Sequence, residues 1–113
     1  MAIVNREFTY RRRIKVSRGD LAAAEKGRKT CTIRLGVAHV DEPTIDLTDG
    51  ANSLRVEIKS VSTERFRDLS EEHARCEGFT TVEELRTDLR TYYPQIDPDQ
   101  PVTIIRFKRL IDK

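Results

Sequence analysis

The chain has 113 residues, of which 37% are hydrophobic and 35% are charged, and its formal net charge is +2. This composition is typical of a small soluble protein, and no apolar run approaches the ~20 residues that a membrane-spanning helix needs. The first residues lack the apolar segment and cleavage site of a secretory signal, and two cysteines are too few for a disulfide framework. We therefore expect one cytoplasmic domain over residues 1–113, with reduced thiols, no cofactor and no membrane association.

The charges are distributed unevenly along the chain. Residues 1–34 contain ten Lys or Arg and three Asp or Glu, residues 35–101 contain seven and fifteen, and residues 102–113 contain four and one. If the two basic ends meet in the fold, they form a positive face that favours phosphate-bearing partners. The alternative is a solvated surface on which charges are segregated by chance. Four Phe, three Tyr and no Trp are too few for an extended base-stacking platform.

The first third of the chain predicts a strand, a short helix and a second strand. Residues 7–16 (EFTYRRRIKV) alternate apolar and basic side chains, which predicts one half-buried strand. Residues 17–27 (SRGDLAAAEKG) predict a helix that Ser17 or Asp20 caps and a glycine ends. Residues 30–35 (TCTIRL) return to a period of two. One face of this second strand carries Cys31, Ile33 and Leu35, and the other carries Thr30, Thr32 and Arg34.

The middle of the chain predicts a hairpin. Residues 36–50 contain a proline and an Asp49–Gly50 pair, which indicates a loop or short strand that ends in a tight turn. Residues 53–63 (SLRVEIKSVST) form the clearest strand of this region. Its apolar positions change from even to odd numbers, so we expect a bulge near Lys59–Ser60.

Two helices and a last strand complete the predicted order. Residues 69–79 predict a helix capped by a serine, and residues 80–94 predict one that begins with a Thr80–Glu83 capping box. Residues 102–110 (VTIIRFKRL) predict the final strand. The apolar stripe of the second helix consists of Val82, Leu85, Leu89 and Tyr92. The order β-α-β-(β)-β-α-α-β indicates an α+β fold, with helices packed outside a mostly antiparallel sheet.

Several ordered segments resemble the ASCH domain family, a member of the PUA-like superfamily. GRKTCTIRLG (residues 27–36) matches the family's G-x-K-T-x-T-x-R pattern, and ARCEG (residues 74–78) matches its A-x-x-E-G helix. A helix ending at Tyr-Pro and a strand ending in V-x-x-I-x-F follow, so the resemblance spans roughly residues 8–110. It implies a compact, mostly antiparallel β-barrel of about five or six strands flanked by helices.

The resemblance also implies a function. Members of the family are regarded as RNA-binding or nucleoside-handling modules, so the implied partner is RNA or a modified nucleoside. One branch contains small amidohydrolases that remove the acetyl group from N4-acetylcytidine with a Lys, a Thr and a Glu. Matched position by position, these residues are Lys29, Thr32 and Glu77. The segment over residues 35–54 departs from that branch, which places the difference in the loop that would face the substrate.

The residue types themselves are sufficient for amide hydrolysis. That reaction needs an activated nucleophile, a proton carrier and stabilisation of the tetrahedral oxyanion. Thr32 supplies a hydroxyl, Lys29 serves either as the base or as the oxyanion stabiliser, and Glu77 could pass a proton to the leaving nitrogen. Lys29 has the opposite strand parity to Thr32, so the two share a face only if the chain bends after Gly27.

Other polar residues suggest binding roles beside ordinary structural ones. Thr30 and Arg34 share a strand face with Thr32, where a guanidinium suits phosphate or carboxylate. His73 precedes Glu77 by one helical turn; this spacing suits a metal, but without a third ligand we expect a helix-surface or cleft-lining histidine and no metal.

The basic run and the cleft leave several functions open. Arg11, Arg12 and Arg13 either bind phosphates along a sheet edge or protect that edge from aggregation. The function is therefore an amidohydrolase or a non-catalytic RNA-binding module that uses the same cleft, with a ribonuclease as a weaker third option.

Overall fold

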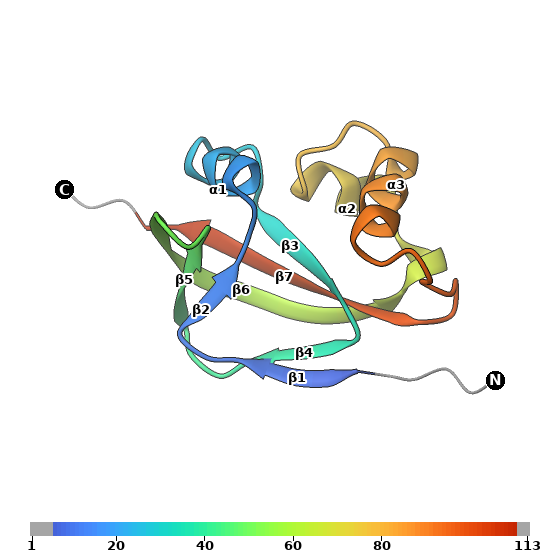
Figure 1. Cartoon of the computed structure of the whole chain (residues 1–113), viewed down its shortest axis with the longest axis horizontal. Coiled ribbons are helices and arrows are strands. Elements are labelled where there is room, and N and C mark those ends of the chain that lie inside the picture. Colours follow the sequence, from blue (N-terminus) through green and yellow to red (C-terminus); the bar gives the residue numbers. More distant parts are fainter. Residues whose placement is uncertain (1–5, 111–113) are drawn as a thin grey trace.

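The computed structural model describes residues 6–110, which form one five-stranded sheet, a two-stranded ribbon and three α-helices (Figure 1). The elements in chain order are β1 (Glu7–Tyr10), β2 (Arg13–Lys15), α1 (Arg18–Glu25), β3 (Cys31–Leu35), β4 (Val37–Val40), β5 (Thr44–Thr48), β6 (Ser53–Arg65), a short 3-10 helix (Phe66–Asp68), α2 (Glu71–Cys76), α3 (Val82–Tyr92) and β7 (Pro101–Arg109). No helix among these residues is long and apolar enough to span a bilayer.

The strand order of the large sheet is β2-β5-β6-β7-β3, and β1 pairs with β4 in a separate parallel ribbon. The predicted α+β class and mostly antiparallel sheet are confirmed, but the predicted closed barrel is wrong. Within the described part of the chain, the edge strands β2 and β3 do not pair with each other. β2 has only three residues, and α1 begins after Val16 and Ser17, so the sheet stays open between its two edges (Figure 1).

The predicted single strand over residues 7–16 is two strands in different sheets. Arg12 adopts a left-handed backbone with φ of 66°, and this breaks the extended chain between β1 and β2. The Arg12 carbonyl then accepts the Asp46 N–H at 2.8 Å, which starts the parallel pairing of β2 with β5. The alternation survives the break, since Phe8 and Ile14 both contribute to the same core.

Several local predictions about turns are confirmed. The ladder between β6 and β7 has a register shift between Ile58 and Ser60, where the change of parity predicts a bulge. The Asp49 carboxylate accepts two backbone N–H groups in the turn between β5 and β6. Ser17 caps α1, as one of the two predicted alternatives. The capping box of α3 lies one residue later than predicted, at Thr81 and Glu84.

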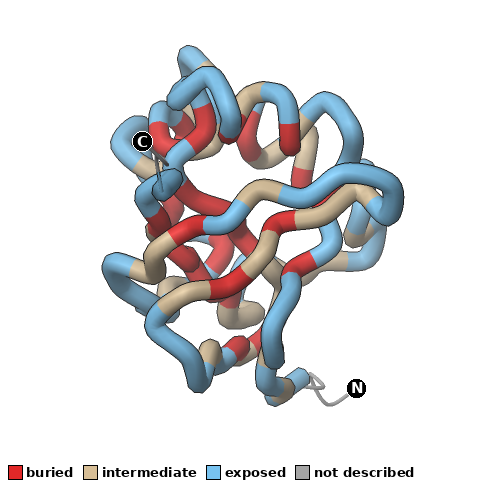
Figure 2. Tube along the Cα trace, turned by 90° about the vertical axis from the view of Figure 1, so that its left-hand side faces the viewer, coloured by how far each residue is buried: buried red, intermediate tan, exposed pale blue. Residues whose placement is uncertain are grey.

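Two hydrophobic clusters share β7, an interior strand of the sheet between β6 and β3. Ile105 and Phe107 of β7 pack in the cluster beneath α1, whereas Val102 and Ile104 pack in the cluster beneath α2 and α3. Burial therefore runs along the sheet and the inner sides of the helices, while the outer turns are exposed (Figure 2). β3 passes between α1 on one side and α2 and α3 on the other (Figure 1). The boundary between the two clusters therefore lies above β3, and we call this boundary the seam.

Candidate functional site

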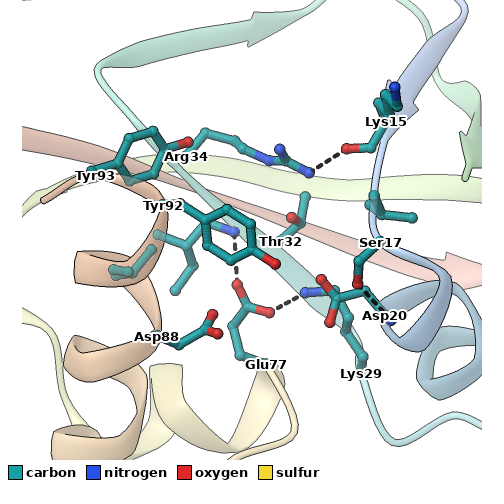
Figure 3. A pocket seen from close by; sticks show the side chains of 13 residues that line it. Lys15, Ser17, Asp20, Lys29, Thr32, Arg34, Glu77, Asp88, Tyr92 and Tyr93 are labelled. Atoms are coloured by element: carbon teal, nitrogen blue, oxygen red, sulfur yellow. Dashed lines mark hydrogen bonds and ion pairs between the residues drawn. The ribbon is translucent and has the colours of Figure 1, made fainter.

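A pocket of about 350 Å3 occupies the seam above β3 (Figure 3). It is lined by Lys15, Val16, Ser17, Asp20, Lys29, Thr32, Ile33, Arg34, Glu77, Asp88, Leu89, Tyr92 and Tyr93. These residues come from the end of β2, from α1 and β3, and from the α2 and α3 side of the fold. The pocket thus lies at the opening of the sheet, where Arg34 Nη2 of one edge strand donates to the Lys15 carbonyl of the other at 2.8 Å.

Lys29 and Glu77 form a buried ion pair at this pocket. Only 2% of the Lys29 side chain and 7% of the Glu77 side chain are exposed. Lys29 Nζ donates to Glu77 Oε1, and Glu77 Oε2 accepts the Ile33 N–H at 3.0 Å. Both oxygens of the carboxylate are therefore held, one by a cation and one by the backbone of β3.

Local chain geometry explains why Lys29 faces this pocket despite its strand parity. Gly27 ends α1 with a φ of 77°, and the Thr30 N–H then donates to the Cys76 carbonyl at 2.7 Å. Lys29 lies between these two points, before β3 begins, so the strand alternation does not decide its direction. Gly78 ends α2 with a φ of 92° and leaves Glu77 at the C-terminal end of that helix. The chain therefore bends after Gly27, as is needed for Lys29 and Thr32 to face the same pocket.

Burial raises the pKa of the Glu77 carboxyl, because removal from water outweighs the stabilising charge of Lys29 and the hydrogen bond from Ile33. A carboxyl group whose pKa lies above its ordinary value takes up and releases a proton nearer to neutral pH. The environment of Glu77 is thus suited to proton transfer.

Thr32 and Arg34 line the same pocket, as the alternation of β3 predicts. Thr32 is only 3% exposed, and no hydrogen bond joins its hydroxyl to the other residues drawn in Figure 3. Arg34 Nε is buried and lacks an acceptor among the described residues. Thr30 is placed elsewhere: it is exposed and borders a second pocket of about 280 Å3 that also contains Lys108. The Thr32 hydroxyl therefore lines the first pocket without a partner among the residues drawn there, and Arg34 Nε is a buried donor without an acceptor.

His73 and the Arg11–Arg13 run lie outside the pocket. His73 Nδ1 accepts the Ser70 N–H at 3.0 Å, so this histidine completes the N-terminal cap of α2. The three arginines are exposed around the break between β1 and β2, and none lines the pocket. Within the described residues, no group of three or more His, Cys, Asp or Glu could hold a metal ion.

The pocket also contains residues that the sequence analysis did not assign to a site. Asp20, Asp88 and Tyr93 line it, and so does Tyr92, which is 58% exposed at its rim instead of packing in the predicted apolar stripe. A signal for part of this wall exists in the sequence, since Asp88 and Tyr92 are four residues apart and share a helix face.

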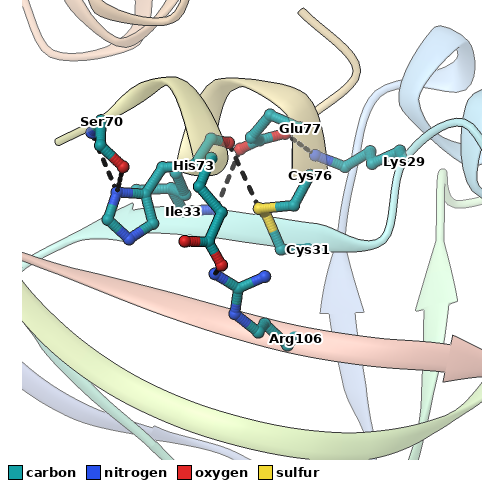
Figure 4. Close-up of a disulfide and its surroundings, with 9 residues drawn as sticks. Lys29, Cys31, Ile33, Ser70, His73, Cys76, Glu77 and Arg106 are labelled. Carbon is teal, nitrogen blue, oxygen red and sulfur yellow. Dashed lines mark hydrogen bonds and ion pairs between the residues drawn. A yellow bond between two sulfur atoms is a disulfide. The ribbon is translucent and has the colours of Figure 1, made fainter. Parts of the chain in front are cut away.

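Cys31 and Cys76 form a disulfide, so the prediction of reduced thiols is wrong (Figure 4). Cys31 of β3 precedes Thr32, and Cys76 of α2 precedes Glu77. Packing of α2 against β3 brings the two Cα atoms to 5.3 Å, within the range that a disulfide requires. A separation of 45 residues gives no hint of this pairing in the sequence. The bond fixes the two elements that carry the pocket's hydroxyl and carboxylate.

Removal of the disulfide should lower the free energy of unfolding by about 2–4 kcal/mol, because the open chain gains conformational entropy when it unfolds. We expect this loss in the Cys31→Ala, Cys76→Ala double variant, measured by urea denaturation without reductant. The parent chain under strong reductant should show a similar loss, whereas the double variant should not respond to reductant. Equal stability of the oxidised parent and the double variant would contradict the assignment of a stabilising crosslink.

Comparisons with known proteins agree on the fold. The sequence matches no family model and no curated protein. A solved ASCH domain from Lactobacillus crispatus superimposes on 93% of this chain and 80% of its own length, with a TM-score of 0.75 and 17% sequence identity. The chain has the fold of an ASCH domain. The resemblance in the sequence is thereby confirmed at the level of the fold.

Other structures with this ASCH-like fold are equally distant in sequence. A protein from Enterococcus faecalis, assigned to the family model DUF984, matches over 97% of this chain and 78% of its own, with a TM-score of 0.62 and 17% identity. A protein from Pyrococcus furiosus matches over 95% of this chain and all of its own, with a TM-score of 0.52 and 20% identity. At such low identities the likeness concerns the fold alone, and function has to be argued from the pocket.

Proposed function

We propose that this chain is an ASCH-family amidohydrolase that removes the acyl group from a modified pyrimidine nucleoside such as N4-acetylcytidine. One observation carries the proposal: a buried Lys29–Glu77 ion pair and the hydroxyl of Thr32 line a single pocket. These residue types match the three that the resemblance implies for the acetylcytidine branch. Buried ion pairs are costly to maintain, and in a pocket they mark a candidate site of chemistry.

In the proposed acylation step, Thr32 Oγ attacks the carbonyl carbon of the substrate amide. The Glu77 carboxylate accepts the hydroxyl proton, and the Lys29 ammonium stabilises the negative charge that develops on the carbonyl oxygen. The carbon–nitrogen bond then breaks, and the proton on Glu77 passes to the leaving exocyclic nitrogen. Cytidine leaves as a neutral amine, and the acyl group remains on Thr32 as an ester.

The deacylation step reverses these roles with water as the nucleophile. Glu77 accepts a proton from water as its oxygen attacks the ester carbon, and that proton returns to Thr32 Oγ when the ester bond breaks. The products are a carboxylic acid, which ionises to acetate, and the free threonine hydroxyl. Each step uses the same three side chains, and the raised pKa of Glu77 suits a group that both accepts and donates a proton.

The rest of the pocket suits a planar, mostly uncharged ligand. Its volume of about 350 Å3 falls in the range of small-molecule sites. Tyr92 and Tyr93 supply aromatic surface on which a base can stack, and the Arg34 guanidinium supplies N–H donors for a carbonyl oxygen of that base.

Incubation of the chain with N4-acetylcytidine tests the proposal directly. We expect cytidine and acetate to be released in equal amounts. Chromatography measures the cytidine, and an enzymatic assay measures the acetate. Uridine serves as a blank, because it carries no acylated exocyclic amine. Failure to release acetate, combined with salt-sensitive binding of single-stranded RNA, would instead support the alternative of a non-catalytic RNA-binding module.

A further inference from the structure

The second pocket, of about 280 Å3, lies between the end of α1 and the last residues of β7. Figure 1 shows the end of β7 running beneath α1, where Phe107 packs in the same hydrophobic cluster as Ala24. The ladder between β3 and β7 ends at the pair Cys31 and Arg106, so β7 continues past the start of β3. The pocket occupies this step in the sheet. It is lined by Ala24, Gly27, Lys29, Thr30, Phe107, Lys108 and Arg109.

The two basic ends of the chain meet at this second pocket, as a positive face requires. Lys29 comes from the N-terminal basic segment, and Lys108 and Arg109 come from the C-terminal one. No Asp or Glu of residues 6–110 lines the pocket, whereas in the first pocket three cations stand beside three carboxylates. Because Lys29 is already paired with Glu77, the second pocket is left with the two positive charges of Lys108 and Arg109.

The fold holds the Arg109 guanidinium in place at this pocket. Its Nη1 donates to the carbonyl of Glu25, the last residue of α1. The guanidinium also lies close to Gly27, since a Cβ added there would come within 3.9 Å of its carbon. A guanidinium has five N–H donors in a planar fork, so one bond to a carbonyl leaves others for an oxyanion. A group that is fixed before the ligand arrives loses less entropy on binding.

Lys108 faces one carboxylate in the sheet, and that carboxylate is engaged elsewhere. Glu57 of β6 is its register partner, but a Glu57 oxygen lies 3.4 Å from the Lys59 ammonium, and Glu57 does not line the pocket. Lys108 and Thr30 are both exposed at the second pocket. The ammonium and the threonine hydroxyl are therefore available as donors to a ligand that Arg109 also contacts.

We propose that the second pocket is a binding site for a phosphate group, which Lys108 and Arg109 hold and to which Thr30 adds a donor. A phosphate carries a charge of about −2 near neutral pH and several strong acceptor oxygens, which matches two cations and a hydroxyl. The planar guanidinium suits two phosphate oxygens, and the ammonium suits a third. Ala24 and Phe107 add an apolar wall for an organic group, so the phosphate is either free or part of a monoester. This site is separate from the proposed deacylation and does not depend on it.

Calorimetric titration with inorganic phosphate and with phenyl phosphate, at low salt in a phosphate-free buffer, tests the site. We expect saturable binding of both, weakened by about tenfold or more in the Lys108→Gln, Arg109→Gln double variant. Tighter binding of phenyl phosphate would support the proposal with a monoester as the ligand, and equal affinities would support it with free phosphate.

The matched control is the Lys26→Gln, Arg28→Gln double variant. It removes the same charge from exposed residues beside the end of α1, outside the pocket, and should weaken binding by less than about threefold. The single variant Lys108→Gln keeps the bond between Arg109 and Glu25, so it should melt like the parent chain and still weaken binding by about threefold or more.

Three results would overturn the proposal. The first is the absence of saturable phosphate binding by the parent chain. The second is binding that the Lys108→Gln, Arg109→Gln double variant retains. The third is an equal loss in the control double variant, because it would show that net charge attracts the anion and that no site holds it.

Discussion

The Thr32→Val variant is expected to lose deacylation activity by about 10³-fold or more while keeping the fold of the parent chain. Valine has nearly the shape of threonine but carries no nucleophile. Because no hydrogen bond joins the Thr32 hydroxyl to the pocket residues drawn in Figure 3, its removal takes no hydrogen-bond partner from them. Initial rates of acetate release and a thermal melt of the same sample measure the two effects separately.

The conservative Thr32→Ser variant provides the control for this prediction. Serine keeps the hydroxyl, so we expect activity to remain within roughly one order of magnitude of the parent. If Thr32→Val turned over N4-acetylcytidine at the parental rate, threonine would not be the nucleophile. Attack by a water molecule on the substrate, with Glu77 as its base, would then replace the covalent mechanism.

The Lys29→Met variant should lower the free energy of unfolding by about 3–5 kcal/mol, because it leaves the Glu77 carboxylate buried without its cation. Methionine keeps much of the length of the lysine side chain, so the loss reports the charge more than the packing. Urea denaturation at neutral pH measures it. The same variant should also be inactive, since Lys29 stabilises the oxyanion in the proposed mechanism.

The double variant Lys29→Met, Glu77→Gln should recover a large part of that stability. The glutamine amide is neutral, and its oxygen still accepts the Ile33 N–H that Glu77 accepts in the parent. Stability is thus restored without activity, which separates folding from chemistry. A loss of less than ~1 kcal/mol in the Lys29→Met single variant would contradict the account, because such small effects are typical of solvated pairs.

The sequence predicted the pocket wall that a single strand provides. The structure places Thr32 and Arg34 in the pocket, as the alternation along β3 predicts, but Ile33 of the opposite face also lines it and Thr30 does not. Strand periodicity alone does not predict the direction of the Lys29 side chain, because that direction depends on the bend at Gly27. The resemblance to the ASCH family identified Lys29 as a candidate site residue, which the strand period alone does not do.

The features that the sequence missed depend on long-range geometry. The Cys31–Cys76 disulfide arises from packing of α2 on β3, which spacing along the chain does not encode. The sequence predicts Asp20 only as an alternative helix cap and assigns no role to Asp88, because their placement at one pocket depends on how the two helices pack. The predicted barrel is not closed. Pairing of the two sheet edges depends on how far β2 extends before α1 begins, which the sequence pattern does not show.

Covalent trapping tests the central claim most directly. The chain is mixed with N4-acetylcytidine, quenched in acid within the first turnovers and analysed by intact and peptide mass spectrometry. The account predicts a fraction of chain that carries one acetyl group, located on Thr32 and absent from the Thr32→Val variant. Rapid release of acetate with no acetyl group on Thr32 at any quench time, or acetylation of Lys29 in its place, would contradict the account.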